Sequence, residues 1–411
     1  MKKTFAEVVL LARTGLNPRK NFKLGQGNNN YITIKNIKNN TLVIDENTDV
    51  VDDEAIKLIH KRSKIKKGDI LFASIGRMGD MYIIEDDPVG WDINESVFAF
   101  TLDTNIVRQK YFYYIFRVKS TLDYLASNSS GSTFKSIKMN QLKKMTFDIP
   151  PLEKQDQIVA TLDKVCNVIE MRKQELISLD DLIKARFVEM FGDENNSRNW
   201  NVVNVEEVAD VQVGVVIKPS QYYTDESNGV KAFRSLNIGA GFIKDIDWAY
   251  FTKEGHLKNS KSILKENDLL IVRSGAPGTA CVVTEEFAGC NAVDVIIAHL
   301  DCEKVNPYYL CTFTNMPHGK KQINEGTGGA AQQHFNVGKY NKLRLMLPPK
   351  MLQDEFAVFI QQVNKSKFVE RFPEFSLFYR LFSPLDSEMI CIFPYFYPCE
   401  ESAREIREIF I

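Results

Sequence analysis

The sequence predicts an α+β protein: two duplicated mixed α/β domains joined by a long helix of the coiled-coil type. Three observations support this prediction. A segment around a proline pair recurs in the second half, short apolar runs punctuated by glycine, asparagine and aspartate fill each half, and no glycine or proline interrupts residues 152–191. A second long helix begins near the C-terminus and is predicted to be truncated.

The duplication is clearest around the two proline pairs. "IPPLEKQDQIVATLDKV" begins at Ile149, and "LPPKMLQDEFAVFIQQV" begins 198 residues later at Leu347. Gly131 precedes the first pair by the same interval that separates Gly329 from the second. Upstream, "KKGDILFASIGRMG" matches "KENDLLIVRSGAPG", and "EVVLLARTG" resembles "EVADVQVG". Proline pairs are common before helices, but the shared gap-free spacing makes duplication the better interpretation.

Each half predicts a compact domain of short strands with a few helices. The strand candidates include "YITIKNI", "DILFASI" and "SVFAFTL" in the first half, and "KAFRSL", "DLLIVRS" and "DVIIAHL" in the second. A helix is expected at 109–126. The predicted boundaries are a first domain at 1–150, a central helix at 151–192, a second domain at 193–347, the start of a second helix at 348–368, and a tail at 369–411.

The central helix carries an apolar seam with seven-residue spacing. Arg172 interrupts the seam, and charged residues occupy most other positions. A seam of this length predicts a partner helix. The residues of the seam on the central helix are Leu162, Val165, Ile169, Leu176, Leu179, Ile183, Phe187 and Met190.

The second long helix begins with a regular apolar face, but this pattern does not continue into the tail. Phe356, Ile360 and Val363 line one face, but prolines at 373, 384, 394 and 398 forbid one continuous helix through the aromatic tail. With this helix cut short, the central helix is expected to leave an apolar stretch from Leu176 to Met190 uncovered.

The composition is that of an ordinary globular protein. The chain has 411 residues, 44% of them hydrophobic, and a net charge of −1, so a nucleic-acid partner would require local basic surfaces. The seven cysteines form no CxxC pair, which favours reduced thiols in the cytoplasm over disulfides or a zinc site. No transmembrane run is present, and Glu7 interrupts the apolar start, so no signal peptide is expected.

These features together resemble the specificity (S) subunit of type I restriction-modification systems. The resemblance rests on the repeated proline-pair motifs, the glycine segments before them and "FVEMFGD" at 187–193, and it covers residues 1–368. It implies two target-recognition domains that each read one half of a bipartite double-stranded DNA site. It also implies an antiparallel helical pair that acts as a spacer and docks DNA adenine methyltransferase (M) subunits, with restriction and translocase (R) subunits joining the assembly.

The resemblance implies a subunit that catalyses nothing, and the sequence offers little chemistry of its own. No P-loop is present, and no cofactor is expected. "NPYY" at 306–309 faintly resembles an adenine-methyltransferase motif but lacks its second proline, so a strand-to-helix turn is the alternative. The five histidines lack metal-ligand spacing. "HGKKQINEGTGG" at 318–329 fits either a phosphate cradle or a surface loop.

Candidate DNA contacts are basic residues in segments rich in glycine, asparagine or serine. Lysine and arginine hold phosphates, and arginine can also read guanine; each candidate has the alternative of a solvated surface charge. They are Arg19, Lys20, Lys23, Arg77 and Lys135 in the first half, and Lys218, Arg234, Arg273, Lys320 and Lys321 in the second.

Two other functions stay open at this point. The chain could be a stand-alone or degenerate DNA-modification enzyme, which methylation by the chain alone would reveal. It could also be a repeat scaffold that binds only protein, which sequence-dependent binding to duplex DNA would exclude.

Overall fold

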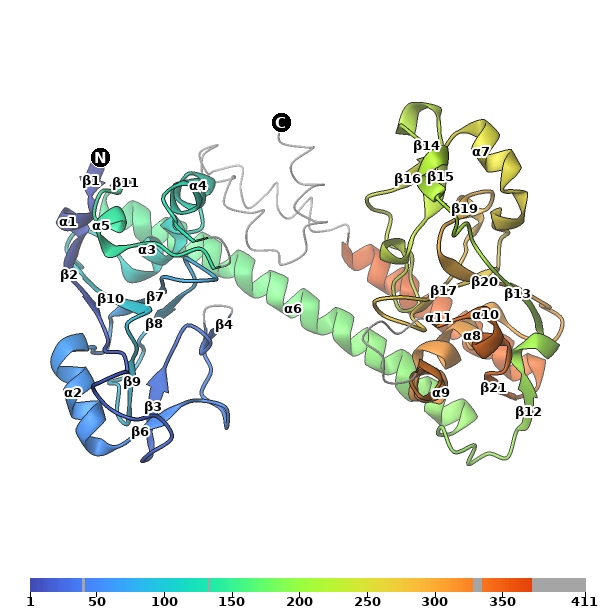
Figure 1. Ribbon diagram of the computed structural model, residues 1–411, viewed down its shortest axis with the longest axis horizontal. Coiled ribbons are helices and arrows are strands. Elements are labelled where there is room, and N and C mark those ends of the chain that lie inside the picture. The colour runs from blue at the N-terminus through green and yellow to red at the C-terminus, as the bar shows by residue number, and fades with distance from the viewer. Residues whose placement is uncertain (39–40, 132–133, 328–334, 372–411) are drawn as a thin grey trace. The chain divides into compact units, whose positions relative to one another are not determined.

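The computed structural model describes residues 1–38, 41–131, 134–327 and 335–371, which form two compact units (Figure 1). One unit is Met1–Ile169, and the other begins at Glu170 and includes the last described helix. Helix α6, Leu152–Phe191, supplies residues to both.

Each unit is built around a four-stranded antiparallel sheet. The strand order is β2-β10-β7-β8 in the first unit and β13-β20-β17-β18 in the second, so the same order is used twice. The strands are β2 Val9–Thr14, β7 Ile70–Ala73, β8 Met81–Ile83 and β10 Val97–Leu102, then β13 Ala209–Val213, β17 Leu269–Val272, β18 Ala280–Val282 and β20 Val295–Leu300.

Among the described residues, the first unit has three further sheets, ordered β6-β3-β9, β1-β11 and β4-β5. The second unit has a four-stranded sheet, β14-β16-β15-β19, and a two-stranded one, β12-β21. The sheets correspond in part, because β3 pairs in parallel with β9 as β15 does with β19, and β1 pairs with β11 as β12 does with β21. These strands are β1 Lys2–Thr4, β3 Asn29–Ile32, β4 Ile37–Lys38, β5 Thr41–Leu42, β6 Val50–Val51, β9 Trp91–Ile93, β11 Thr146–Asp148, β12 Asn201–Asn204, β14 Tyr223–Thr224, β15 Val230–Phe233, β16 Ala249–Phe251, β19 Asn291–Ala292 and β21 Arg344–Leu347.

The helices at the end of each unit also correspond. In both units a short helix and then one strand precede the long helix. The α-helices are α1 Phe5–Val8, α2 Asp53–Ser63, α3 Gln109–Ile115, α4 Lys119–Ser127, α5 Met139–Leu142, α6, α7 Lys253–Lys258, α8 Pro307–Asn315, α9 Pro317–Thr327, α10 Val337–Asn341 and α11 Lys350–Arg371. Short 3₁₀ turns lie at η1 Val205–Glu207, η2 Pro219–Tyr222, η3 Glu226–Asn228, η4 Ser235–Asn237, η5 Ser260–Ser262 and η6 Glu285–Phe287.

The repeated topology confirms the predicted fold class of two duplicated mixed domains and a long helix. The segment 109–126 is helical as expected but divides into α3 and α4. Two other local expectations were wrong. Residues 318–327 are helical in α9, where a loop or phosphate cradle was considered. Helix α11 continues to Arg371, past the expected end at 368. The predicted aromatic and proline-rich tail was 369–411, and its residues from 372 onward lie outside the described residues.

Glycine ends the first strand of each central sheet because another backbone passes close by. A Cβ at Gly15 would lie 1.6 Å from the carbonyl oxygen of Ile93, and one at Gly214 would lie 2.3 Å from that of Ala292. Any side chain would force these segments apart. The repeated glycine of "EVVLLARTG" and "EVADVQVG" therefore marks the crossing of two backbones.

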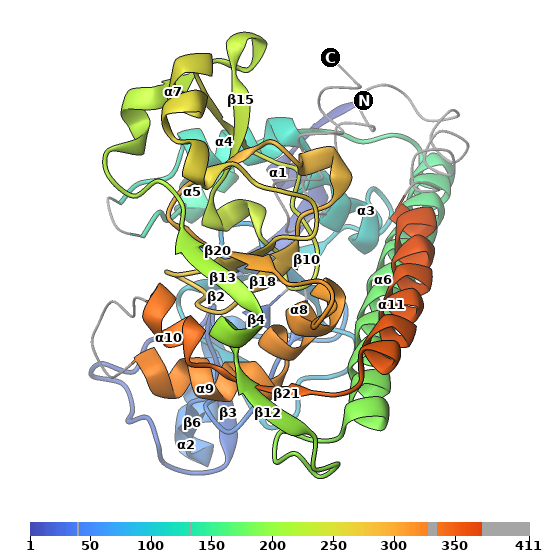
Figure 2. The ribbon, with the colours of Figure 1, turned by 90° about the vertical axis from the view of Figure 1, so that its right-hand side faces the viewer.

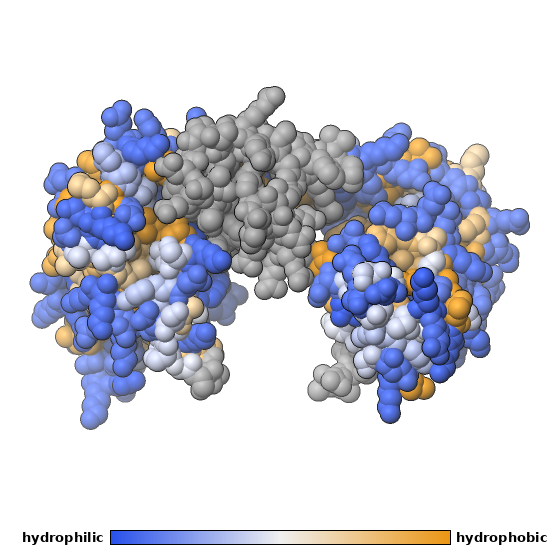
Figure 3. All heavy atoms as spheres, turned by 90° about the horizontal axis from the view of Figure 1, so that it is seen from above, coloured by the Kyte–Doolittle hydropathy of each residue, from blue (hydrophilic) through white to orange (hydrophobic). Residues whose placement is uncertain are grey.

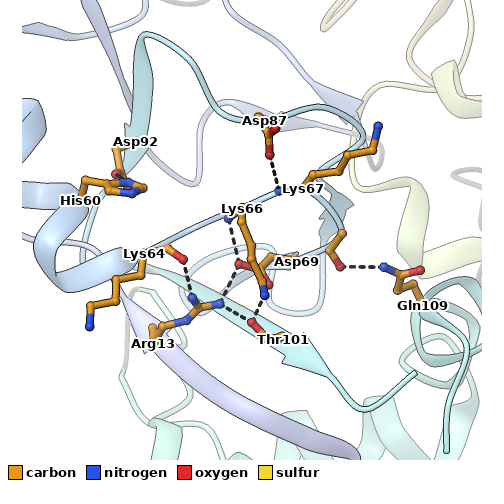
Figure 4. Close-up of polar contacts among 11 residues, drawn as sticks. Arg13, His60, Lys64, Lys66, Lys67, Asp69, Asp87, Asp92, Thr101 and Gln109 are labelled. Atoms are coloured by element: carbon orange, nitrogen blue, oxygen red, sulfur yellow. Dashed lines mark hydrogen bonds and ion pairs between the residues drawn. The ribbon is translucent and has the colours of Figure 1, made fainter. Parts of the chain in front are cut away.

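A buried aspartate joins the strands of each central sheet, with different partners in the two units. Asp69 accepts from Thr101 Oγ1 at 2.5 Å and pairs with Arg13 Nη2 at 2.7 Å (Figure 4). Its counterpart Asp268 is 2.7 Å from His299 Nδ1, and His299 Nε2 lies 2.7 Å from Gln212 Nε2. The two central sheets therefore share a buried carboxylate at the same position, but different side chains form hydrogen bonds with it.

A buried glutamine fixes the start of each long helix. Gln155 Oε1 accepts from the backbone N–H of Arg108 at 2.8 Å, and its Nε2 donates to the carbonyls of Ile106 and Pro150. Gln353 repeats all three contacts with Asn306, Lys304 and Pro348. Both side chains are fully buried. The glutamine of the repeated motif thus ties the helix to the loop that enters α3 or α8.

The N-terminal part of α6 belongs to the first domain's core. Leu162 and Val165 are buried there with Ile158, beside Phe112 and Phe147. Ile169 packs at the edge of this cluster. The first third of the predicted seam therefore faces its own domain, not the second helix that we expected as its partner.

The C-terminal part of α6 packs against α11 in an antiparallel pair (Figure 2). Phe187 and Phe191 each lie 5.4 Å from the Phe356 ring. Ion pairs join Arg186 to Glu355 at 3.1 Å and Lys367 to Asp180.

The pairing corrects the expected uncovered stretch from Leu176 to Met190. Ile183, Phe187 and Met190 pack in the second unit's core, which includes Phe356 and Ile360 of α11. The short second helix covers this end because it begins opposite the last turns of α6 and runs back toward Asp180. Leu176 and Leu179 are half-buried.

The surface of both units is mostly hydrophilic on the face drawn in Figure 3, with separate smaller hydrophobic areas. Among the described residues, no helix is long and apolar enough to cross a membrane.

We expect Gln155→Leu to lower the free energy of unfolding by about 3 kcal/mol, because it leaves one N–H and two carbonyl groups without their partner. Urea denaturation of the purified chain would measure the loss. Gln157→Leu is the matched control: its side chain is exposed on the same helix, and its effect should stay within about 0.5 kcal/mol. Equal midpoints for the two variants would contradict the role of Gln155.

Phe356→Ala should lower the free energy of unfolding of the second unit by about 3–5 kcal/mol, because it opens a cavity between α6 and α11. Phe356 is fully buried, whereas Val358, two residues along, is 54% exposed. Val358→Ala should therefore change stability by less than about 0.5 kcal/mol. Thermal or urea unfolding followed by far-UV circular dichroism would compare the two, and a similar small effect for both would refute the packing argument.

Candidate nucleic-acid interface

Each unit carries a loop anchored by a buried asparagine. Asn36 Oδ1 accepts from the backbone N–H of Thr33 at 2.9 Å, and its Nδ2 donates to the carbonyl of Val43 at 3.1 Å. Asn237 does the same with Arg234 at 2.9 Å and with Lys244 at 3.4 Å. We call these segments the first and second Asn-anchored loops. The shared pattern holds each loop on its unit's parallel strand pair.

A hairpin follows each anchoring asparagine. In the first loop, Ile37 of β4 pairs with Leu42 of β5. In the second, Ile238 bridges Ile243. The hairpins therefore occupy equivalent places in the two units.

The turn after the third strand of each central sheet lies against the Asn-anchored loop. In the first unit, Arg77 Nη2 donates to the carbonyl of Ile37 at 2.8 Å. In the second, the backbone N–H of Gly241 donates to the carbonyl of Ala280, just after the turn, at 2.8 Å. Loop and turn thus form one surface in each unit.

Both Asn-anchored loops border a hollow. The first hollow, about 220 Å³, is lined by polar residues that include Thr33, Lys35, Lys38, Asp45 and Asn47. The second hollow, about 480 Å³, lies between the second loop and the turn before Thr279. Its lining includes Ile238, Ala240, Phe242 and Ala276, together with Ser235 and Lys244. The two hollows thus lie at equivalent places in their units, but the lining of the first is polar and that of the second is partly apolar.

Several of the predicted DNA contacts gather at these surfaces. Lys135 contacts the Arg77 turn, since its carbonyl accepts from Gly76 N–H at 3.0 Å. In the second unit, Arg234 and Arg273 each precede a residue that lines the second hollow, and Lys320 Nζ donates to Thr279 Oγ1 at 3.4 Å.

Most of these basic side chains are already engaged within the chain. Arg77 pairs with Asp80 at 3.2 Å, and Arg273 pairs with Asp294 at 2.6 Å. Arg234 donates to the backbone of Asp247. Burial lowers the pKa of the half-buried Lys320 ammonium. These groups therefore shape the surface as well as supplying charge.

The remaining candidates lie elsewhere. Arg19, Lys20 and Lys23 are exposed in the loop between β2 and β3, and Lys218 is exposed just before η2. Lys321 is exposed on helix α9 and is not in the loop that we expected. The structure does not bring these five residues to either hollow.

The sequence prediction missed the residues that build the surface: Asn36 and Asn237, and Lys35, Lys38, Phe242 and Lys244 beside them. A signal was available, because "YITIKNI" and "AFRSLNI" share the pair Asn-Ile. Their spacing of 201 residues differs from the 198 of the proline pairs, so a gap-free comparison does not align them.

The NPYY segment forms a helix cap. Asn306 Oδ1 accepts from the N–H of Tyr308 at 3.0 Å, and Nδ2 donates to Asp354 Oδ1 at 2.8 Å. Its carboxamide is thus used to start α8 and to bind α11, as the strand-to-helix alternative requires. Among the described residues, no group of three or more histidine, cysteine or acidic side chains is placed to hold a metal ion.

The comparison with known families decides between the alternatives. A family model described as the type I restriction modification DNA specificity domain matches residues 1–180 and again residues 197–370. The chain belongs to this family. The two matches coincide with the two halves of the duplication, so the chain carries two copies of the specificity domain.

Two curated relatives of the specificity-domain family are similar over part of their length. The type I restriction enzyme MjaIX specificity subunit of Methanocaldococcus jannaschii is 22% identical over 275 residues, which is 62% of each chain. The MjaVIII specificity subunit of the same organism is 23% identical over 239 residues, 54% of each chain. The chain thus spans about three-fifths or less of the curated relatives that it matches.

Solved structures show the same fold along nearly the whole chain. The type I restriction-modification system S subunit from M. genitalium covers 96% of this chain with a TM-score of 0.52 and 14% identity. A chain from a study of complex assembly and conformational transition of the type I R-M system covers 97%, with a TM-score of 0.53 and 16% identity. At these identities the likeness concerns the fold alone.

Proposed function

We propose that this chain is the DNA-recognition subunit of a type I restriction-modification complex. Its two specificity domains each read one half of a bipartite site in double-stranded DNA. The observation that carries the proposal is the pair of Asn-anchored loops. Each loop borders a hollow at the equivalent place in its own domain, but different side chains line the two hollows. Two readers of different half-sites need a common scaffold and unlike contacts, because sequence is read at base edges.

The chain acts as a non-catalytic subunit, and M subunits supply the adenine methylation. R subunits join the same assembly for cleavage, and the complex works in the cytoplasm of a bacterium or archaeon. The relatives are named as specificity subunits of type I restriction enzymes. The capped and paired carboxamide of Asn306 argues against a stand-alone methyltransferase built on NPYY.

Helix α6 offers the surface to which the M subunits would dock. Several of its apolar side chains remain exposed: Met171 at 70%, Ile177 at 52%, Leu182 at 48% and Val188 at 43%. Lone exposed apolar residues are common, but four within five turns of one helix indicate a contact surface. A protein-binding scaffold without DNA recognition would share this feature, so the decisive test concerns DNA.

Deleting the gene should remove adenine methylation from one bipartite motif in the host genome, and restoring the gene should bring it back. Single-molecule sequencing of the host DNA would map the methylated adenines. The matched control restores a gene that lacks the second domain, which should not recover the motif. If every motif stays methylated after deletion, the proposed function is wrong.

Repeating residues 171–177 of α6 should lengthen the spacer of the bipartite site by up to about three base pairs. Seven residues add about 10 Å of helix, and one base pair rises about 3.4 Å. The insertion lies between the part packed on the first core and the part paired with α11, and seven residues turn the helix nearly twice, so each face is kept.

The methylated motif of cells carrying the insertion would measure the spacer. Both half-sites should be unchanged, whereas inserting seven glycine and serine residues at the same place should abolish methylation. An unchanged spacer in the heptad variant would show that α6 does not set the site length.

A further inference from the structure

The second hollow has the composition of a surface that reads a methyl group. We propose that it recognises the 5-methyl group of a thymine in the major groove, with Phe242 as the determining side chain. This inference rests on the proposed function and names the base that the second domain selects. Apolar contact is the means by which proteins recognise this methyl group.

The chain holds Phe242 in a fixed position. It ends a tight turn in which the N–H of Gly239 donates to the carbonyl of Phe242 at 2.9 Å. The ring lies over Gly239, where a Cβ would come within 2.6 Å of it. Gly241, with a φ of +86°, completes the turn and is bound to β18. The residue is nonetheless 44% exposed, so part of it is accessible to a ligand.

The shape of the segment suits the major groove. One antiparallel bridge, between Ile238 and Ile243, closes the turn into a tight loop, and the major groove admits narrow elements such as a β-ribbon. Ala240 and Ala276, both exposed, extend the apolar lining beside the ring. Small side chains there leave room for a base edge.

The arginines beside the hollow are held by other groups of the chain. Guanine O6 and N7 are read most often by an arginine or a lysine. Arg273 is held by Asp294 and by the carbonyl of Phe335, and Arg234 is held by Asp247. Lys244 lines the hollow and supplies a donor suited to thymine O4, to guanine or to a phosphate, so the selection of thymine rests on the apolar contact with Phe242.

The first hollow provides an internal contrast. Its lining is wholly polar, with Lys35, Lys38, Asp45 and Asn47 among it. Such groups read base edges through hydrogen bonds. The one methyl group in that lining belongs to Thr33, which is half-buried and donates its hydroxyl to Asn36 Oδ1. The half-site read by the first domain should therefore depend less on thymine methyl groups than the half-site read by the second.

The test uses the full chain assembled with its M subunits and duplexes in which each thymine of the bipartite site is replaced by uracil in turn. Uracil keeps the base pair and removes only the methyl group. We expect one position, in one half-site, to weaken binding about fourfold, the factor that corresponds to one buried methyl group. Phe242→Ala should abolish that difference, and Phe242→Leu should retain part of it.

Leu257→Ala is the matched control, because Leu257 is 70% exposed in the same unit but does not line the hollow; it should keep the fourfold difference. Recognition of the other half-site by each variant reports that the chain is folded. The inference fails if no thymine is sensitive to uracil while the complex still methylates a bipartite site, or if the sensitivity survives in Phe242→Ala. A complex that recognises no bipartite site overturns the proposed function instead.

Discussion

A single buried carboxamide at the first turn of each long helix organises the structure around it. Gln155 and Gln353 each join three backbone segments: the first proline of the pair, the loop before α3 or α8, and the helix that carries the glutamine. A glutamine is suited to this place because it offers one acceptor and two donors on a flexible stem, which satisfy groups that would otherwise be buried unpaired. The long helices can leave their domains at a defined point because this junction is closed.

Helix α6 extends that constraint to both domains, since it contributes to two separate cores. Leu162 and Val165 lie in the first, and Phe187 and Phe191 lie in the second. Loss of packing at either end would expose large apolar side chains, so each domain stabilises part of the same helix. The networks of Asp69 and Asp268 also repeat one element in both domains. The buried carboxylate has the same position in each sheet, but its partners are an arginine and a threonine in the first domain, and a histidine, itself bound to a glutamine, in the second.

The architecture could be predicted from the sequence because its signals are local and repeated. The proline pairs, the glutamine after them and the seven-residue spacing of α6 each reflect a short stretch of backbone. Helix α9 escaped prediction because Gly319 suggests a loop, yet Gly319 packs so tightly on Thr314 that a Cβ would lie 2.7 Å from its Cα; tertiary packing overrides propensity there. The hollows were not predicted because Asn36 and Asn237 gain their role from hydrogen bonds to backbone groups three to seven residues away, and asparagine is equally common in loops without such anchoring.

The spacing between equivalent residues records how the two halves have diverged. Tyr309 follows Tyr111, and Gln353 follows Gln155, by 198 residues, whereas the interval is 201 for the anchoring asparagines and 199 for the buried aspartates. Insertions and deletions have thus accumulated in the stretch that bears the hollows, while the stretch from the third helix to the proline pair has kept its length. Changes in loop length can therefore alter the ligand surface during evolution without altering the junction between the domain and its long helix, because the two lie in separate stretches of the sequence.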